Sequence, residues 1–245
     1  METWKKSPPP ATIAPGEVHV WRFGLDLPDG LLARLRPTLS PDELARAGRF
    51  RFPLHAGRFV AGRARLRALL SRYTGVAAAE MRFRYTARGK PELDPNPGAL
   101  HFNLAHSDGL ALCAVARNLP LGVDLERLDR AVECQQIAER FFSPAEAAAI
   151  AALPPASRRA AFFRCWTRKE ALLKATGEGL SFGLNQFTVT VRDDEPARVL
   201  HWPVGESDSV AWNLTELEPA PGYTGALALR GRLEAVCCRE YDPAS

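Results

Sequence analysis

Two carboxylates stand two positions apart in the segment GVDLE, residues 122–126. The segment belongs to a predicted strand, and strand side chains alternate between the two faces, so Asp124 and Glu126 share one face. Neighbouring carboxylates repel each other unless a cation lies between them. The pattern fits either an acidic, solvent-facing strand or a site for a hard cation such as Mg²⁺, which prefers oxygen ligands and often also binds substrate phosphate.

The segment WTRKEALLKATGEGL, residues 166–180, places charges on the apolar side of a predicted helix. Trp166, Glu170 and Lys174 advance by about 40° per step and form one slowly turning line. An ion pair between Glu170 and Lys174 explains the spacing but not the position on the aromatic stripe. Charges on a buried face need partners or a ligand. We therefore expect Glu170 to supply a third carboxylate to a metal ion bound at Asp124 and Glu126, and Lys169 and Lys174 to contact phosphate. The Trp166 ring is expected to pack between two halves of the chain.

Helices and short strands alternate in the segments that must position these side chains. Ser40 with Glu43 and Ser143 with Glu146 have the spacing of capping boxes, and Gly177 is a plausible helix end. The expected helices are 39–50, 57–75, 142–153 and 156–177. The expected strands are 18–27, 81–87, 100–106, 110–116, 121–128, 185–191, 198–204, 209–217, 224–230 and 233–240.

The chain shows a weak internal duplication. Residues 102–116 and 212–230 both contain Asn-Leu, a polar turn and then an apolar strand. The expected organisation is a flexible N-terminal tail over residues 1–15 and two similar halves, 16–120 and 121–245. The strands follow each other closely, so each half should have a mostly antiparallel sheet packed with helices, an α/β (α+β) fold.

Composition favours a soluble globular protein and disfavours several other classes. No apolar run reaches the ~18 residues of a membrane span, and the N-terminal segment has no secretory signal pattern. The chain has five cysteines, an odd number, and none of them has CxxC spacing. This pattern favours reduced thiols of a cytosolic protein over a disulfide framework or a zinc site. A net charge of +4 suits an anionic partner, but the chain has no nucleic-acid-binding motif.

Four motifs in order resemble those of the 4′-phosphopantetheinyl transferases. They are RGKPEL (88–93), FNLAHSDG (102–109), GVDLE and, about 40 residues later, WTRKEALLKATGEGL. The spacing and chain length resemble the larger, Sfp-type members, whose single chain is a pseudo-dimer of two similar α/β halves. The resemblance covers roughly residues 40–190. A lone Asp-x-Glu pair is weak evidence, whereas four ordered motifs are specific.

The resemblance also implies roles for individual residues. Asp124, Glu126 and Glu170 correspond to the family's Mg²⁺ ligands. Lys174 would stabilise or protonate the leaving group, and Glu170, directly or through a metal-bound water, would take the proton of the attacking serine. Asp124 completes the catalytic set, because the sequence does not decide which carboxylate accepts that proton. The residues that correspond to or resemble the family's coenzyme A contacts are Arg46, Arg51, Arg58, Lys90, His106, Ser107, Lys169 and Lys174. Ala105 stands where relatives often have Ser.

The activity implied by the resemblance is Mg²⁺-dependent transfer of 4′-phosphopantetheine from coenzyme A to a serine of an acyl or peptidyl carrier protein, with release of 3′,5′-ADP. Phosphoryl transfer depends on positioning and charge neutralisation, which these residue types can supply. The enzyme is expected to be a cytoplasmic monomer with its active site between the halves, bound to neither membrane nor nucleic acid. Two alternatives stay open: another Mg²⁺-dependent phosphotransferase or phosphodiesterase, and a basic nucleic-acid-binding protein.

Overall fold

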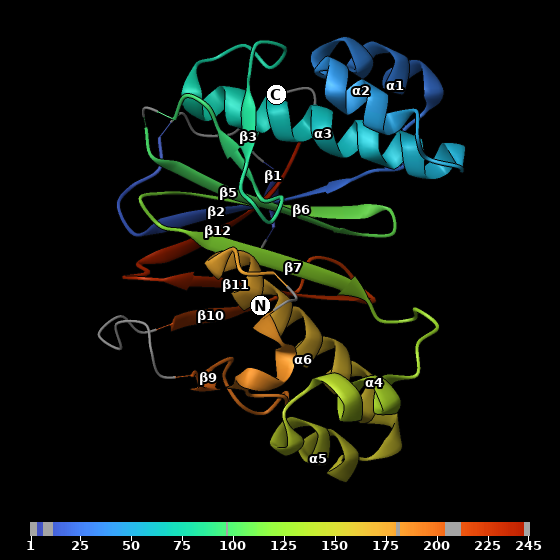
Figure 1. Ribbon diagram of the computed structural model, residues 1–245, viewed down its shortest axis with the longest axis vertical. Helices are drawn as coiled ribbons and strands as arrows, with labels where there is room; N and C mark the ends of the chain where they lie inside the picture. The colour runs from blue at the N-terminus through green and yellow to red at the C-terminus, as the bar shows by residue number, and fades with distance from the viewer. Residues whose placement is uncertain (1–3, 7–11, 97, 180–181, 204–211, 243–245) are drawn as a thin grey trace.

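Two β-sheets pack face to face at the centre of the molecule, and helices cover the outer face of each sheet (Figure 1). The computed structural model describes residues 4–6, 12–96, 98–179, 182–203 and 212–242. Apolar side chains from both sheets form the central core layer, which includes Val20 and Leu112 from one sheet and Val123 and Leu227 from the other. This is the mixed helix-and-sheet architecture that the sequence predicts.

The first sheet has five strands in the order β1-β12-β2-β6-β5. Strand β12 runs parallel to both of its neighbours, and the remaining pairs are antiparallel. Helix α3 covers the outer face, with two short helices beside it (Figure 1). The strands are β1 (Lys5–Lys6), β2 (Glu17–Gly24), β5 (Leu100–Ser107), β6 (Leu110–Arg117) and β12 (Ala235–Glu240), and the helices are α1 (Asp29–Leu35), η1 (Arg36–Thr38), α2 (Pro41–Ala47) and α3 (Pro53–Thr74). A separate hairpin contains β3 (Phe83–Tyr85) and β4 (Pro91–Leu93).

The second sheet has three antiparallel strands in the order β10-β11-β7. Helix α6 lies across its outer face, and α4 and α5 pack beyond α6 (Figure 1). The strands are β7 (Leu121–Arg127), β10 (Trp212–Leu217) and β11 (Tyr223–Arg230), and the helices are α4 (Cys134–Phe141), α5 (Pro144–Ala152) and α6 (Pro155–Thr176). The short helix η3 (Leu184–Gln186) and the hairpin of β8 (Thr188–Val189) and β9 (Val199–His201) complete this half.

The helix ends follow the local signals in the sequence. Both predicted capping boxes are present, Ser40 with Glu43 and Ser143 with Glu146. Gly177 ends α6 in the left-handed conformation at φ 76°, which glycine adopts without steric cost. The helices α1 and α4 were not expected, because neither has a strong start signal.

The C-terminal strand departs from the expected division of the chain. The boundary at 121–245 assigns Ala235–Glu240 to the second half, whereas this strand pairs with β2 in the first sheet. Part of the tail at 1–15 also contacts the body of the protein, since Lys5–Lys6 pairs with β12 and Trp4 Nε1 donates to the Glu218 carbonyl at 2.8 Å. Residues 1–3 and 7–11 of that tail and residues 204 and 209–211 of two predicted strands lie outside the described residues.

Buried charges fix the position of the first helices. Glu43 of α2 is 2% exposed and accepts hydrogen bonds from Arg63 at 2.5 Å and from Arg67 at 2.7 Å, both on α3. A buried carboxylate needs such partners, so α2 is held firmly against α3. Among the described residues, no helix has both the length and the apolar character needed to cross a membrane.

Candidate active site

Helix α6 lies unusually close to strand β7 because the strand carries a glycine at the crossing. A Cβ atom at Gly122 would overlap the backbone of Ala171 and Ala175. This close approach brings Asp124, which is 7% exposed, to a residue of α6: Lys174 Nζ lies 2.6 Å from Asp124 Oδ1. The same ammonium group donates to the Val123 carbonyl at 3.4 Å. The face that Asp124 shares with Gly122 is therefore the face that α6 covers.

Glu170 and Asp124 form a pair of incompletely compensated carboxylates. Burial raises the pKa of Glu170 to about 7, and the charges of Asp124 and Glu126 add to that rise. Burial likewise raises the pKa of Asp124 to about 6, although Lys174 opposes the change. Asp124 Oδ2 and Glu170 Oε1 are buried without a hydrogen-bond partner among the described residues. Buried carboxylate oxygens that lack donors are the ligand atoms that a divalent cation of the Mg²⁺ type prefers.

Glu126 joins this group to the first half of the chain. Its Oε2 accepts a hydrogen bond from Ser107 Oγ of β5 at 2.7 Å, and its Oε1 pairs with Arg130 at 2.6 Å. Asn103 Oδ1 of β5 accepts from the Val123 N–H of β7 at 2.8 Å. Side chains of β5 thus bind β7 where the two sheets meet, and the acidic residues lie at this junction.

A cavity of about 430 Å³ opens on the first-half side of the junction. Most of its charged lining is basic, and Asp108 is the acidic exception. The lining residues are Leu25, Arg46, Phe50, His55, Arg58, Phe59, His106, Ser107, Asp108 and Arg130. Since Ser107 and Arg130 both contact Glu126, the cavity lies next to the acidic group. Such a lining suits a ligand that carries several negative charges.

The basic residues of the cavity are held by different partners. Arg58 donates to both carboxylate oxygens of Asp26, at 2.6 and 3.1 Å, and the Arg46 guanidinium lies 5.2 Å from the centre of the Phe59 ring. His106 projects from β5, where desolvation lowers its pKa and the charges of Lys174 and Arg58 lower it further. A neutral imidazole near two cations can both donate and accept a hydrogen bond.

Sequence reasoning missed three residues that the structure places here: His55, Arg130 and Asn103. His55 precedes Arg58 by three positions on α3, so helical spacing alone would have placed the two on the same face. Arg130 follows Glu126 by four residues, but in a turn after the strand, where no periodicity applies. Asn103 lies four positions before Ser107, a spacing that puts both on one face of β5.

Lys169 is not at this site, which corrects the expectation that it meets phosphate. Its side chain is fully buried and pairs with Glu146 of α5 at 2.8 Å. Its Nζ also donates to the carbonyls of Leu184 and Phe187, at 2.8 and 2.6 Å. Adjacent residues of a helix point about 100° apart, so while Glu170 faces the junction, Lys169 faces α5 and η3.

Three more expected residues lie elsewhere. Lys90 lines a different cavity, and its Nζ donates to the carbonyls of Leu121 at 3.1 Å and Lys174 at 2.5 Å. Arg51 stacks on Phe52 outside the lining of the basic cavity. The Trp166 ring is not between the halves, because it packs 6.0 Å from the Phe162 ring and 6.2 Å from the Phe142 ring, in the core between α6 and the neighbouring helices.

Comparison with known proteins gives a consistent picture. A family model described as the 4′-phosphopantetheinyl transferase superfamily matches residues 120–228. The chain is 43% identical to the 4′-phosphopantetheinyl transferase HetI of Nostoc sp., over 94% of this chain and 95% of that protein. It is 34% identical to the 4′-phosphopantetheinyl transferase psf-1 of Bacillus pumilus, over 77% of this chain and 78% of that protein. It is 30% identical to the 4′-phosphopantetheinyl transferase Sfp of Bacillus subtilis, over 79% of this chain and 83% of that protein.

Proposed function

The chain belongs to the 4′-phosphopantetheinyl transferase superfamily, and we propose that it transfers 4′-phosphopantetheine from coenzyme A to a carrier-protein serine at the junction of β7, α6 and β5. One observation carries the choice of site. Asp124 and Glu170 are held close together with raised pKa values and with buried oxygens that lack donors among the described residues, beside a basic cavity. Raised carboxylate pKa values next to an anion-binding cavity are typical of a reaction centre.

The acidic residues fit a Mg²⁺ ion. Asp124, Glu126 and Glu170 would hold it, because they offer oxygen donors only and Asp124 and Glu170 each have a buried oxygen without a donor in the described structure. When bound, the ion would neutralise charge on the transferring phosphoryl group. Burial, with neighbouring carboxylates as a further cause, raises the pKa values of Asp124 and Glu170, and a bound cation would offset that cost, which supports this role.

The basic cavity would bind the phosphates of coenzyme A. Arg46, Arg58 and His106 line it, and His55 and Arg130 add two basic side chains to the same wall. Ser107 donates its hydroxyl hydrogen to Glu126 and accepts from the Arg127 N–H, so it can accept one further hydrogen bond at the edge of the cavity. Lys90, Lys169 and Arg51 are left out of this proposal, because none of them lines the cavity.

The reaction forms a bond between the serine oxygen and the phosphorus attached to pantetheine, and it breaks the bond from that phosphorus to 3′,5′-ADP. Glu170 would accept the serine proton, directly or through a water molecule, because its carboxylate faces the junction beside Asp124. Lys174 stabilises the negative charge that develops on the leaving phosphate or donates a proton to it. Its contact with Asp124 at 2.6 Å holds the ammonium group beside the acidic residues.

The cysteines, the net charge and the single chain indicate where the enzyme acts and with which partner. The five cysteines are free thiols, as expected for a protein that acts in the reducing cytoplasm. The net charge of +4 favours association with an acidic carrier protein of fatty acid, polyketide or nonribosomal peptide synthesis. A single chain contains both the acidic group and the basic cavity, so we propose that the enzyme acts as a monomer.

The test uses the full chain with coenzyme A, Mg²⁺ and a panel of apo-carrier proteins, with intact mass as the readout. We expect a carrier to become heavier by one phosphopantetheine arm and 3′,5′-ADP to appear in equal amount. Asp124→Asn should lose this transfer by orders of magnitude and keep its melting transition. A phosphodiesterase would consume coenzyme A without changing the carrier, and a nucleic-acid-binding protein would do neither. Either result, or full transfer by Asp124→Asn, would refute the proposal.

A further inference from the structure

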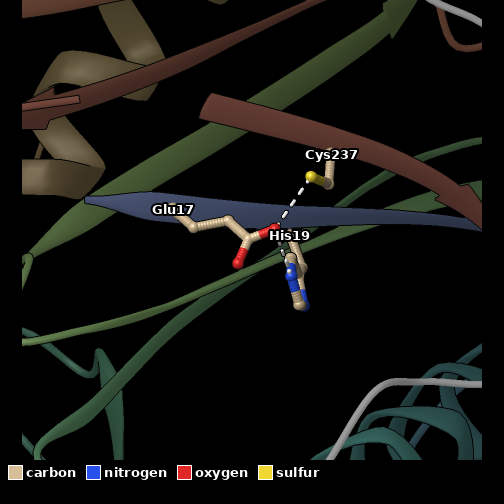
Figure 2. A group of neighbouring side chains, drawn as sticks. All are labelled: Glu17, His19 and Cys237. Carbon is tan, nitrogen blue, oxygen red and sulfur yellow. Dashed lines mark hydrogen bonds and ion pairs between the residues drawn. The ribbon is translucent and has the colours of Figure 1, made fainter. Parts of the chain in front are cut away.

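A second group of ligand-type side chains lies on the first sheet. Glu17 and His19 project from the same face of β2, and Cys237 projects from the neighbouring parallel strand β12, opposite His19 in the register (Figure 2). Cys237 Sγ and Glu17 Oε1 are 3.0 Å apart, and His19 Nε2 and Glu17 Oε1 are 3.1 Å apart. One ligand atom from each side chain lies within 4.8 Å of the other two. None of these residues belongs to the proposed transferase site.

The imidazole of His19 is oriented for a ligand. The side chain is 1% exposed, and its Nε2 faces Glu17 Oε1 at 3.1 Å in a close polar contact that lacks the alignment of a regular hydrogen bond. Its other nitrogen, Nδ1, lies 2.8 Å from the Tyr73 hydroxyl, which also accepts from Trp21 Nε1 at 2.8 Å. A histidine that ligates a metal through one nitrogen is usually fixed by a hydrogen bond at its other nitrogen, and the Tyr73 hydroxyl supplies that bond to Nδ1.

We propose that Glu17, His19 and Cys237 form a binding site for a thiophilic divalent cation of the Zn²⁺ type. Thiolate, imidazole and carboxylate are the ligands that Zn²⁺ takes, and three protein ligands leave a fourth position for water. Mg²⁺ does not fit here, because it prefers oxygen ligands. Binding would form a metal–sulfur bond while the thiol proton leaves to solvent, with no change of oxidation state. The Glu17 side chain is 22% exposed, so the site can be reached from solvent.

The consequence of such a site is a cross-link between distant parts of the chain. Glu17 and Cys237 are 220 positions apart, and β12 crosses from the second half to complete the first sheet. A cation bound to both strands would stabilise the native pairing of β12 with β2, because it binds the folded state and has no preformed site in the unfolded chain. We therefore expect metal to strengthen the fold without taking part in the transfer reaction.

The test is a cobalt titration of the full, reduced and chelator-treated chain. Co²⁺ bound to a thiolate gives a sulfur-to-metal charge-transfer band in the near ultraviolet, whereas Co²⁺ on the oxygen ligands of the transferase site gives none. We expect this band to saturate at one equivalent, to disappear on addition of Zn²⁺, and to be accompanied by a rise of several degrees in melting temperature with Zn²⁺. No band, or a band without any thermal shift, would overturn the proposal.

Variants of the two partly exposed ligands keep the test independent of folding. Cys237→Ser should lose the band, and Glu17→Gln should weaken cobalt binding at least tenfold; both should lose the thermal shift. Cys134→Ser is the matched control, since Cys134 is also a partly buried free thiol but lies in the other half on α4, and it should bind like the wild type. If the band survives in Cys237→Ser or is lost in Cys134→Ser, the assigned ligands are wrong.

Discussion

Lys174 Nζ of α6 lies 2.6 Å from Asp124 Oδ1 of β7, and this contact aligns the helix motif with the strand motif across 50 positions of sequence. Glu170 lies one turn earlier on the helix, where burial and the charge of Asp124 raise its pKa to about 7 although Lys174 opposes the rise. Both carboxylates therefore stay incompletely compensated, although Asp124 contacts the Lys174 ammonium group directly.

Replacing Glu170 by Gln should raise stability above neutral pH in the absence of metal. The native pKa of Glu170 is about 7, above its ordinary value of 4.5, so the native state holds the proton more tightly than the unfolded state. Wild-type stability should therefore fall as pH rises from about 4.5 through about 7. The variant lacks this loss, and at pH 8 it should be more stable by about 1–3 kcal/mol. Urea unfolding with chelator at pH 4 and pH 8 measures the difference, and equal values for both proteins at pH 8 would contradict it.

Replacing Gly122 by Ala should separate β7 from α6. The added methyl group would overlap the backbone of Ala171 and Ala175, which cannot move without shifting the helix. We expect a loss of about 3 kcal/mol in the free energy of unfolding, typical of overpacking, and a more than tenfold loss of transfer because Lys174 moves away from Asp124. Gly24→Ala is the control, since its Cβ would have room, and it should leave both quantities nearly unchanged. Equal behaviour of the two variants would argue against the close crossing.

Lys169→Met should destabilise the protein and leave coenzyme A affinity intact. Removing the ammonium group leaves Glu146 buried with two backbone donors and the weak Cys165 thiol but no cation, a change that costs about 3–5 kcal/mol for a buried pair. A second substitution, Glu146→Gln, should recover part of that loss because it removes the unpaired charge. Denaturant unfolding and calorimetric titration with coenzyme A separate the two effects. Weak binding in a variant of normal stability would restore the sequence-based expectation that Lys169 meets phosphate.

Arg46→Met should weaken coenzyme A binding about tenfold, because a charged hydrogen bond to phosphate contributes about 1.5–3 kcal/mol at most. Arg51→Met is the matched control: Arg51 also stacks on a phenylalanine but lies outside the cavity lining, so we expect less than a twofold change. The loss for Arg46→Met should be smaller with dephospho-coenzyme A if the residue contacts the 3′-phosphate, and it should shrink with added salt. Equal affinities for both variants would remove Arg46 from the site.

Trp166→Ala and Lys174→Ala should cause different kinds of damage. Trp166 packs against Phe142 and Phe162, and its loss should cost about 3 kcal/mol of stability, as for a large core aromatic. Lys174 is 30% exposed, so its loss should change stability by about 1 kcal/mol or less while slowing transfer by orders of magnitude. Lys174→Arg should not rescue fully, since a planar guanidinium differs from a compact ammonium group. Melting curves and single-turnover rates test both variants. If Lys174→Ala transfers at the wild-type rate, the Lys174–Asp124 contact is an ordinary ion pair and Lys174 has no role in the reaction.

Local periodicity was enough to place the carboxylates of β7. A strand alternates every two residues, so Asp124 and Glu126 had to share a face, and the contact of Asp124 with Lys174 confirms that the face meets α6. The capping boxes at Ser40 and Ser143 likewise depend on residues three positions apart, which is within reach of any local argument. The motifs indicated the family because their residue types, order and spacing along the chain resemble those of its members.

The surroundings of each motif residue depend on helices and strands that are far away in the sequence. Lys169 and Lys174 lie on the same helix with the same charge, yet one is buried against Glu146 of α5 and the other reaches Asp124 of β7. Helical spacing gives the angle between two side chains. Only the packing of helices and strands decides which of those side chains faces an acid, a carbonyl or a cavity. For the same reason β12 joins the first sheet: strand pairing is a contact between distant segments, and the sequence determines the strand while the folded chain determines its neighbour.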